Sequence, residues 1–558
     1  ALSQLWPRTS VLGVINFKDG IMSISVLLGN RVLGVLGLAA VMLGAFVACD
    51  FGKKATPLPA MPLVALDFNG EVVNKGILPL GFRGDGNISY GQGLEGEALD
   101  LSDSAVFRKP LVLTNSHRTS LIDYPGLTFL LWVKKSPNDY NSYTVAAQMQ
   151  DSEDFDVKGW AIRTEECGSW SWWISDGMEQ TRYKASPERQ PLNDGAWHQI
   201  GFSMDFNTRE VRLYYDGVNR AVYTLPQEDL EVFDREIFLG ASPLALDPVM
   251  EAFNGMIDEL SLWSRVLSPD QVAALFAQYR KPVKTMPRRL PDSLTVMTWN
   301  LWGGGMREGR FVGPRRIADM IAESGADLVA IQEGFASGPL IADMLDFYYY
   351  QRSEGLAVLS RYPLGQTYDV YRPRHAGAVT IELPRQQQVV FCPLYLSYLP
   401  NLAPYIMSGN ASADSVLLRE QETRGAEMRY ISWELQALLD RNDRVPVILA
   451  GDFNSGSHLD WTAANRSKRY DLVLPYPATQ TLERAGFSDA YREVFPDPLK
   501  APGFTWSPRF KEVLHDRVNF IFYHGNTVSP TSARVVDQHP LGFPSDHAAV
   551  VVVFDWKE

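Results

Sequence analysis

The strongest constraint on this chain is a set of apolar, strand-like runs between residues 294 and 558 that each meet a polar residue at one end. The polar residues are Asn300 after LTVMTW, Glu333 after LVAIQ, Asp452 and Asn454 after VILAG, Asp516 before RVNFIFY, and Asp546-His547 before AAVVVVF. Side chains i and i+2 of a strand share a face, so Asp452 and Asn454 are expected to point the same way. A phosphate site on a hard cation needs such groups at converging strand ends, because Mg²⁺ takes oxygen ligands from one or two carboxylates, water and phosphate.

Helix-like segments alternate with these runs. In PRRIADMIAESGA, Ile317, Met320 and Ile321 lie on one helical face, and Gly325 is a stop signal. Between about 420 and 441, apolar residues such as Met428 recur at helical spacing, and the buried strand RVPVILAGDFN follows. Alternating strands and helices predict an α/β body with packed sheets over residues 294–558.

Residues 62–282 have a different pattern, in which short β-rich runs are separated by Gly, Asn, Asp and Pro. In EVRLYYDG, the alternation has the period of a half-buried strand, and Asp216-Gly217 makes the turn. Many such runs predict an all-β jelly-roll sandwich. Near the end of this region, MIDELSLW is a predicted strand, and Ser268 is the predicted N-cap of a short helix with Pro269 at its first position. Residues 283–293 form the predicted linker.

Two segments identify the all-β region, AWHQIGFSMDFNTREVRLYYDGV and FNGMIDELSLWSRVLSPDQVAALFAQ. Together they resemble a laminin-G-like module of the concanavalin A type. The resemblance implies a domain that binds carbohydrate or protein, often beside Ca²⁺, with Asp258 as a candidate calcium ligand. The alternative is that Asp258 accepts hydrogen bonds from backbone donors at a strand edge. Trp170, Trp172 and Trp173 also have two interpretations, sugar stacking or the buried face of a strand.

The second region carries several motifs in a fixed order, TWNLWGG, LVAIQE, VLSRYPL, GDFN, HDRVNFIFY and PSDH. In this order they resemble the endonuclease/exonuclease/phosphatase superfamily, whose fold is the α/β four-layer sandwich of DNase I. The resemblance implies a hydrolase that uses Mg²⁺ or Mn²⁺ for in-line attack of water on phosphorus.

The same resemblance implies a role for each matched residue. Glu333 would bind the metal, Asn300 would hold a metal water or the phosphate, and Asp546 would touch a second metal. Asp452 would position the attacking water or aid the metal, and Asn454 would orient the phosphate. His547 would be the general base or a phosphate-binding imidazole, held in its tautomer by Asp516. For each residue taken singly, the alternative is a capping role at a strand end.

Two positions depart from the family's pattern. Tyr395 stands where many members have a His; a phenol still donates a hydrogen bond to a phosphate oxygen, but it is not a cation near neutral pH. Asn519 stands where many members have an Asp, and an amide there would orient an imidazole without stabilising its charged form. Asp516 precedes Arg517 as in the DNase I branch and is therefore the preferred partner of His547.

The segment SHLDW follows GDFN closely. His458 and Trp461 are therefore candidates for the wall of a substrate pocket. The alternative is a structured loop without substrate contact.

The amino-terminal segment predicts export. The apolar run Val32–Ala48 follows Arg31 and ends before Cys49, which resembles a bacterial lipobox. Residues 1–49 are thus interpreted as a signal and lipoprotein leader with lipidation at Cys49, and residues 50–61 as a tether. The expected location is a membrane-anchored lipoprotein in the periplasm or on the cell surface. The alternative is an uncleaved anchor that starts nearer Ile24.

The negative net charge of the chain limits the class of substrate that it is expected to bind. The chain has a formal net charge of −13, and from residue 291 on it carries about 25 Lys and Arg against about 31 Asp and Glu. This balance disfavours a protein held to nucleic acid by broad electrostatics. The leading hypothesis is an exported, metal-dependent phosphodiesterase or phosphatase for a phospholipid head group, phosphosugar or nucleotide, with a glycan as candidate ligand of the jelly roll. The alternatives are an extracellular nuclease and a surface glycan-binding protein with an inactive hydrolase fold.

Overall fold

The computed structural model describes residues 13–18, 21–26, 61–78, 81–83, 88–102, 110–114, 121–150, 157–177, 180–225, 236–244, 252–281, 290–440 and 444–557. The chain divides into two compact units, residues 1–55 and 56–558. In the first unit, β1 (Gly13–Lys18) pairs with β2 (Ile21–Val26) in antiparallel register. The predicted apolar leader, Cys49 and the tether up to residue 60 lie outside the described residues. Within the described ranges, none of the helices combines the length and apolar character that a bilayer span needs.

The first part of the second unit is a sandwich of two antiparallel sheets. One sheet has the order β12-β11-β10-β9-β16-β7-β4, and the facing strands have the order β15-β14-β13-β8-β17-β6-β5, with β3 paired to β17. The elements are β3 (Val64–Leu66), β4 (Gly81–Arg83), β5 (Ser89–Gln92), β6 (Glu97–Asp100), β7 (Leu111–Thr114), β8 (Gly126–Lys135), β9 (Thr144–Gln150), β10 (Lys158–Thr164), β11 (Trp170–Asp176), β12 (Gln180–Lys184), β13 (His198–Asp205), β14 (Glu210–Tyr215), β15 (Val218–Thr224), β16 (Ile237–Leu239), β17 (Gly255–Trp263) and α1 (Pro269–Phe276). The predicted jelly-roll sandwich is confirmed.

The tryptophan cluster lies in the core of this sandwich. Trp170 and Trp172 are fully buried, and Trp172 packs against Phe202 of the facing sheet with 5.8 Å between the ring centroids. Trp173 is buried as well. The core interpretation therefore holds for all three, and sugar stacking on them is wrong, because no ring presents an open face.

Two further predictions for the jelly roll concern hydrogen-bond acceptors. Ser268 caps α1 by accepting a hydrogen bond from the Gln271 amide, and Pro269 is the first helical residue, as predicted. Asp258 is fully buried on β17, where its two carboxylate oxygens accept hydrogen bonds from the amides of Leu94 and Glu259, each at 2.8 Å. Asp258 thus satisfies backbone donors, and calcium binding there stays a prediction.

The second part of the unit is built on two packed sheets, with strand orders β28-β29-β18-β19-β21-β20 and β22-β23-β24-β25-β27-β26. The strands are β18 (Ser293–Asn300), β19 (Leu328–Gln332), β20 (Tyr348–Ser353), β21 (Leu356–Ser360), β22 (Leu364–Tyr368), β23 (Ala378–Glu382), β24 (Gln388–Tyr395), β25 (Val447–Asp452), β26 (Ser488–Asp489), β27 (Asn519–His524), β28 (Val528–Val536) and β29 (Ala549–Trp556). The helices are α2 (Val312–Ser324), α3 (Ser337–Met344), α4 (Ala403–Met407), α5 (Ala413–Glu422), α6 (Arg424–Leu439), α7 (Pro477–Arg484) and α8 (Ala490–Val494).

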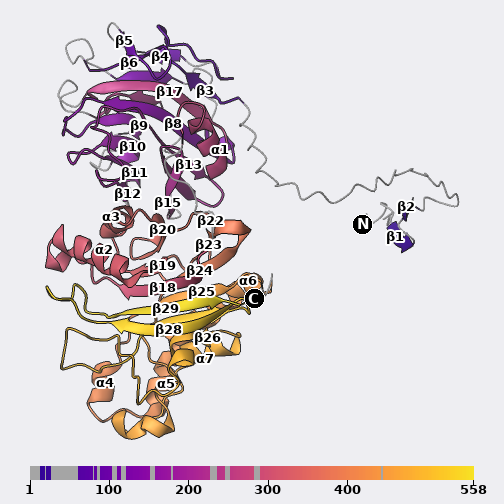
Figure 1. Cartoon of the computed structure of the whole chain (residues 1–558), viewed down its shortest axis with the longest axis vertical. Coiled ribbons are helices and arrows are strands. Elements are labelled where there is room, and N and C mark those ends of the chain that lie inside the picture. Colours follow the sequence, from indigo (N-terminus) through magenta and orange to yellow (C-terminus); the bar gives the residue numbers. More distant parts are fainter. Residues whose placement is uncertain are drawn as a thin grey trace, which may run out of the picture. The chain divides into compact units, whose positions relative to one another are not determined.

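Helices cover both outer faces of these sheets. Val296 of β18 and Ile448 of β25 belong to the apolar core between the sheets. Ile317 of α2 packs with the outer face of β18 and β19, and Met428 of α6 packs with the outer face of β25 and β27. This is the predicted α/β four-layer sandwich, confirmed. Figure 1 shows α4 and α5, in orange, together in a lobe beyond β28.

The two parts share one continuous sheet. β15 of the jelly roll pairs in parallel with β20, so that Ala221 lies opposite Tyr349. Across the same boundary, the Asp343 carboxylate accepts hydrogen bonds from the Ser186 amide at 2.7 Å and from Gln190 Nε2 at 2.6 Å. The jelly roll is therefore joined to the α/β sandwich by backbone pairing and by a buried carboxylate.

We expect Asp343→Ala to destabilise both parts together by about 1–3 kcal/mol, because it removes the acceptor for two buried donors. Urea unfolding followed by tryptophan fluorescence and by far-UV circular dichroism measures this. Asp346→Ala is the matched control, since Asp346 forms a partly exposed ion pair with Arg220, and exposed pairs contribute about 0–1 kcal/mol. Two separate transitions, only one of them shifted by Asp343→Ala, would contradict a single cooperative unit.

Burial raises the pKa of Asp258 to about 7, well above the value of an unfolded Asp. The folded protein therefore holds this proton in a pH range where the unfolded chain has lost it, and the contribution to stability disappears as pH rises from about 4 to about 7. Asp258→Asn removes the titration, so the variant should gain stability relative to the native protein between about pH 5 and about pH 8. Thermal unfolding across this range, in EDTA, tests it; a difference in Tm that does not change with pH would refute the assignment.

Candidate active site

Strand register brings the predicted polar residues to one edge of the packed sheets. β18 and β19 are parallel, so Asn300 lies opposite Gln332 and next to the strand end from which Glu333 emerges. β24 and β25 are also parallel, so Tyr395 lies opposite Asp452, and Asp452 in turn lies opposite Asn519 of antiparallel β27. Residues up to 219 positions apart in the sequence therefore meet because five strands end or begin at the same edge.

Glu333 is held by three donors. Its Oε1 accepts hydrogen bonds from Tyr395 Oη at 2.8 Å and from Asn300 Nδ2 at 3.3 Å, and its Oε2 accepts one from the Gly303 amide at 3.2 Å. Its backbone has φ of 53°, in the left-handed region that a residue with a side chain rarely adopts. This strained turn and the three donors fix the carboxylate at the mouth of the site.

Asp452 is fully buried beside Glu333. Its Oδ2 accepts a hydrogen bond from Asn300 Nδ2 at 3.1 Å, and its Oδ1 accepts one from the Asn454 amide at 2.9 Å. One carboxamide nitrogen thus contacts both carboxylates, one with each of its N–H groups. Burial raises the pKa of Asp452.

His547 faces the same carboxylate. Its Nε2 lies 3.8 Å from Asp452 Oδ2, and its Nδ1 lies 3.0 Å from Asn519 Oδ1. A carboxamide oxygen only accepts hydrogen bonds, so the proton of the neutral ring is on Nδ1 and Nε2 is free to accept one. The indole of Trp506 packs on the imidazole with 4.8 Å between the ring centroids.

The prediction that Asp516 orients His547 is wrong. Asp516 Oδ2 accepts a hydrogen bond from Trp461 Nε1 at 2.8 Å, and Asp516 Oδ1 lies 3.3 Å from Arg469 Nη1. The partner of the imidazole is Asn519, three residues later. The sequence pattern already indicated position 519 as an alternative partner of His547. The resemblance of Asp516-Arg517 to the DNase I branch favoured Asp516 instead.

Tyr395, Asn454 and Asp546 complete the set that the structure brings together. Burial, reinforced by the nearby carboxylates of Asp452 and Glu333, raises the pKa of Tyr395, so its phenol stays a hydrogen-bond donor. The side chain of Asn454 donates to the Leu396 carbonyl at 3.0 Å, with its backbone in the left-handed region. Asp546 lines the same cavity, and burial together with Glu333 raises its pKa to about 6.

The predicted substrate contacts of His458 and Trp461 are wrong. Trp461 is fully buried and donates to Asp516. His458 contacts Thr479 Oγ1 at 2.8 Å and Glu483 Oε2 at 2.9 Å, and it lines a separate cavity of about 680 Å³ with Phe487 and Phe522. The segment SHLDW is thus the structured loop of the alternative prediction, because both polar rings have protein partners.

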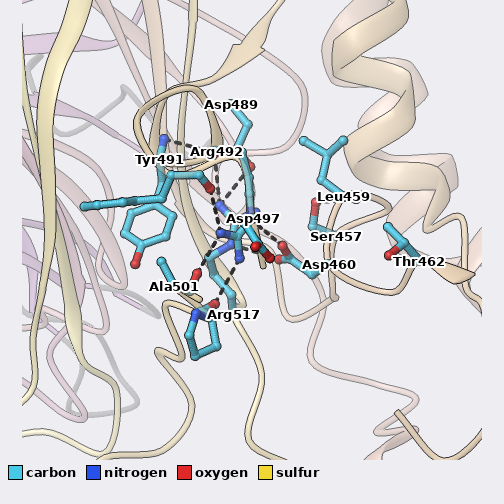
Figure 2. Close-up of polar contacts among 12 residues, drawn as sticks. Ser457, Leu459, Asp460, Thr462, Asp489, Tyr491, Arg492, Asp497, Ala501 and Arg517 are labelled. Carbon is cyan, nitrogen blue, oxygen red and sulfur yellow. Dashed lines mark hydrogen bonds and ion pairs between the residues drawn. The ribbon is translucent and has the colours of Figure 1, made fainter. Parts of the chain in front are cut away.

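A buried charge network behind the site was missed. Figure 2 shows Asp460 between two arginines: its Oδ1 accepts from Arg492 Nε at 2.6 Å, and its Oδ2 accepts from Arg517 Nε at 2.8 Å. Arg517 also contacts Asp489. The network joins the loop after GDFN to the start of β27, which carries Asn519. Asp460 belongs to the motif SHLDW and Arg517 to the motif HDRVNFIFY, but nothing in the sequence indicates that they pair.

Most of the assembled residues line a cavity of about 440 Å³, a size typical of sites for small molecules, whereas Asp452 and Asn519 are fully buried and do not line it. One part of its wall is Asn300, Glu333, Tyr395, Asn454, Asp546 and His547. Trp302, Trp506 and Arg307 form an adjoining part. The charged side chains of the wall are mostly acidic.

The donor set fits a divalent cation. Glu333, Asp452 and Asp546 bring three carboxylates to one site, and His547 Nε2 lies 3.8 Å from Asp452. A bound cation would supply positive charge among them. Among the described residues, no group of three or more His, Cys, Asp and Glu side chains has the arrangement of a metal site. Mg²⁺ in proteins is usually held by one or two carboxylates, waters and the substrate phosphate. Glu333 and Asn300 would hold it, with Asp546 nearby.

Comparison with known proteins separates the two parts of the chain. Residues 297–547 match the profile of the Endonuclease/Exonuclease/phosphatase family, and residues 112–273 match that of the Concanavalin A-like lectin/glucanases superfamily. The Caenorhabditis elegans protein F14F9.5, which is uncharacterised, is 28% identical over 291 residues, covering 46% of this chain and 90% of that protein.

Solved structures similar to this chain cover about half of it. Humanized D. rerio TDP2 is 17% identical to this chain, with a TM-score of 0.34. The match covers 48% of this chain and 100% of the TDP2 chain. The human Nocturnin catalytic domain is 17% identical, with a TM-score of 0.33, and the match covers 48% of this chain and 96% of the Nocturnin chain. The 3'-5' exonuclease of Neisseria meningitidis is 17% identical, with a TM-score of 0.35, and the match covers 47% of this chain and 100% of the exonuclease chain.

The family profiles, the four-layer sandwich and the converging strand ends agree with one another. Residues 297–547 form a domain of the endonuclease/exonuclease/phosphatase family, and residues 112–273 form a concanavalin A-like domain that precedes it.

Proposed function

We propose that residues 294–558 form a divalent-metal-dependent phosphoric ester hydrolase that acts on small phosphate esters. One observation carries the proposal: Asn300 Nδ2 contacts both Glu333 and Asp452, and His547 Nε2 lies 3.8 Å from Asp452. Glu333, as a carboxylate for a metal, and the imidazole of His547 line one cavity, and the buried Asp452 carboxylate contacts residues of its wall.

The residues divide the hydrolysis between them. Water forms a new P–O bond as the ester P–O bond opposite to it breaks, and the departing alcohol takes up a proton. Asp452 and the unprotonated Nε2 of His547 are placed to orient the attacking water and to accept its proton. Asn454 Nδ2 donates one N–H to the Leu396 carbonyl and keeps the other for a phosphate oxygen. The hydroxyl of Tyr395 donates to Glu333 and fixes that carboxylate. A bound divalent cation would neutralise the negative charge of the phosphate.

Asn519 in place of an aspartate is compatible with this mechanism. The amide oxygen fixes the ring and its tautomer but carries no charge. When His547 takes up a proton on Nε2, the carboxylate 3.8 Å away, that of Asp452, faces it directly. The stabilising charge therefore acts on the opposite nitrogen, and the substitution at position 519 does not require an inactive site.

The cavity supports small esters over duplex nucleic acid. A volume of about 440 Å³ and a mostly acidic wall suit a head group, a phosphosugar or a nucleotide.

We further propose that the protein is exported and anchored at Cys49, on the basis of the apolar run before it, and that the jelly roll contributes a glycan- or protein-binding surface.

Glu333→Gln should lower kcat/KM for bis-p-nitrophenyl phosphate by about a hundredfold or more in Mg²⁺, because the amide no longer attracts a cation. Glu323→Gln, on an exposed position of α2, is the matched control and should match the native protein. EDTA should abolish the native activity, and added Mg²⁺ or Mn²⁺ should restore it. Equal activity of Glu333→Gln, with or without EDTA, would overturn the proposal.

A single-strand nuclease is the second candidate, and one surface favours it. The guanidinium groups of Arg307 and Arg509 lie 4.3 Å and 5.0 Å from the ring centroid of Trp302, which lines the cavity. Aromatic rings with arginines are typical of surfaces on which unpaired bases stack.

The two candidates differ in their response to salt. If strands bind along this surface, hydrolysis of a single-stranded oligonucleotide should exceed that of bis-p-nitrophenyl phosphate and fall steeply with ionic strength, because phosphate contacts release counterions. We expect the reverse order of substrates and a shallow dependence on salt. Steady-state rates over a KCl series distinguish the two, and Trp302→Ala should reduce only the oligonucleotide rate if the nuclease assignment is right.

A further inference from the structure

The catalytic cavity has a second set of polar residues that hydrolysis itself does not use. We call these residues, Glu420, Arg424, Ser455, Tyr476 and Asp516, the inner subsite; all five line the cavity and are buried. Glu420 lies near the end of α5 and Arg424 begins α6, so the subsite lies where the α4–α5 lobe joins the sandwich.

The charges of the inner subsite balance in pairs. Glu420 Oε1 accepts a hydrogen bond from Arg424 Nη2 at 2.8 Å, and Glu420 Oε2 accepts one from Ser455 Oγ at 2.8 Å. Asp516 lies 3.3 Å from Arg469. Each carboxylate of the subsite is therefore paired with an arginine. The two oxygens of Glu420 each keep a lone pair for another donor, whereas Asp516 Oδ1 also accepts a hydrogen bond from the Arg517 amide at 3.0 Å.

One buried donor of the subsite has no partner. Arg424 donates from Nη1 to the Pro400 carbonyl at 3.0 Å and from Nη2 to Glu420, but its Nε has no hydrogen-bond acceptor in the part of the chain that the structure describes. Buried donors are nearly always hydrogen-bonded. Because Arg424 lines the cavity, a ligand bound there is a candidate source of the missing acceptor.

The subsite adjoins the phosphate position through the chain itself. Ser455 and Gly456 directly follow Asn454. A Cβ on Gly456 would lie 2.9 Å from Asp516 Oδ2 and 2.5 Å from the ring of Tyr476. Glycine thus lets the chain directly after Asn454 pack closely against these two side chains, which places the subsite next to a phosphate held at Asn454.

The chemistry of the wall selects among ligands. A second phosphate would meet the carboxylates of Glu420 and Asp516. A quaternary ammonium group or an alkyl chain offers no acceptor to Arg424 Nε. A hydroxyl group both donates to a carboxylate and accepts from a guanidinium, and the C–H faces of a polyol suit the apolar side chains of Leu402, Ile406 and Leu514 that also line the cavity.

We propose that the inner subsite binds the uncharged, hydroxyl-rich alcohol of a phosphate ester, such as a glycerol or sugar group. The substrate class is therefore a polyol phosphate ester. The inference rests on the proposed function, because the subsite has a role only if the adjoining residues hydrolyse the ester.

The test compares substrates that share the phosphate but differ in the alcohol. Glycerophosphoglycerol is the soluble polyol diester, vesicles that carry phosphatidylglycerol present the same head group in a lipid, and glycerophosphocholine and a dinucleotide are the competing classes. We expect the native protein to have its highest kcat/KM on one of the two glycerol esters, and which of them is faster identifies the soluble or the lipid source. Faster hydrolysis of the choline ester or the dinucleotide would overturn the inference.

Variants then assign the preference to the subsite. Glu420→Gln and the milder Tyr476→Phe should each lower the ratio of kcat/KM for the glycerol ester to that for bis-p-nitrophenyl phosphate by about tenfold, the effect of a lost hydrogen bond to a substrate hydroxyl. Tyr405→Phe, outside the cavity, is the matched control. A ratio unchanged in both variants would refute the inference while leaving the proposed function intact. Absence of hydrolysis of every ester by the native protein would instead refute the proposed function.

Discussion

The site depends on one shared contact, the carboxamide of Asn300 between the carboxylates of Glu333 and Asp452. The two acids come from different sheets, so this contact also joins the layers of the sandwich at their catalytic edge. Without a donor between them, two carboxylates at this spacing would repel each other, and burial already raises the pKa of Asp452. Tyr395 adds a second donor to Glu333, and a cation would add positive charge. The geometry is therefore preorganised by neutral donors, and the metal completes the charge balance.

The sequence was sufficient for the architecture and for most of the site. Apolar runs that end on Asn300, Glu333 and Asp452 specify strands with functional ends, and parallel register places those ends together, so these residues could be predicted from the amino-acid pattern alone. The partner of His547 could not, because Asp516 and Asn519 both lie near the start of β27 and only the side-chain directions decide between them. The prediction that His458 and Trp461 contact substrate was wrong for a related reason, because proximity to GDFN in the sequence does not determine whether a ring faces the cavity or the core.

The sequence predicts a linker between the two domains but does not predict how they contact each other. In the structure β15 and β20 pair, and Asp343 accepts donors from the jelly roll. Pairing between strands more than a hundred residues apart leaves no local signal, because an edge strand has the same alternation whether or not another strand joins it. A ligand on the jelly roll would thus be held in a fixed relation to β20, rather than at the end of a flexible connection.

The most direct test of the account is anomalous diffraction from crystals grown with Mn²⁺ and a phosphate ester that is not hydrolysed. The account predicts a manganese ion in contact with the Glu333 carboxylate, with the phosphate between that ion and the imidazole of His547. A manganese ion bound elsewhere, with the phosphate remote from Glu333 and His547, would contradict it.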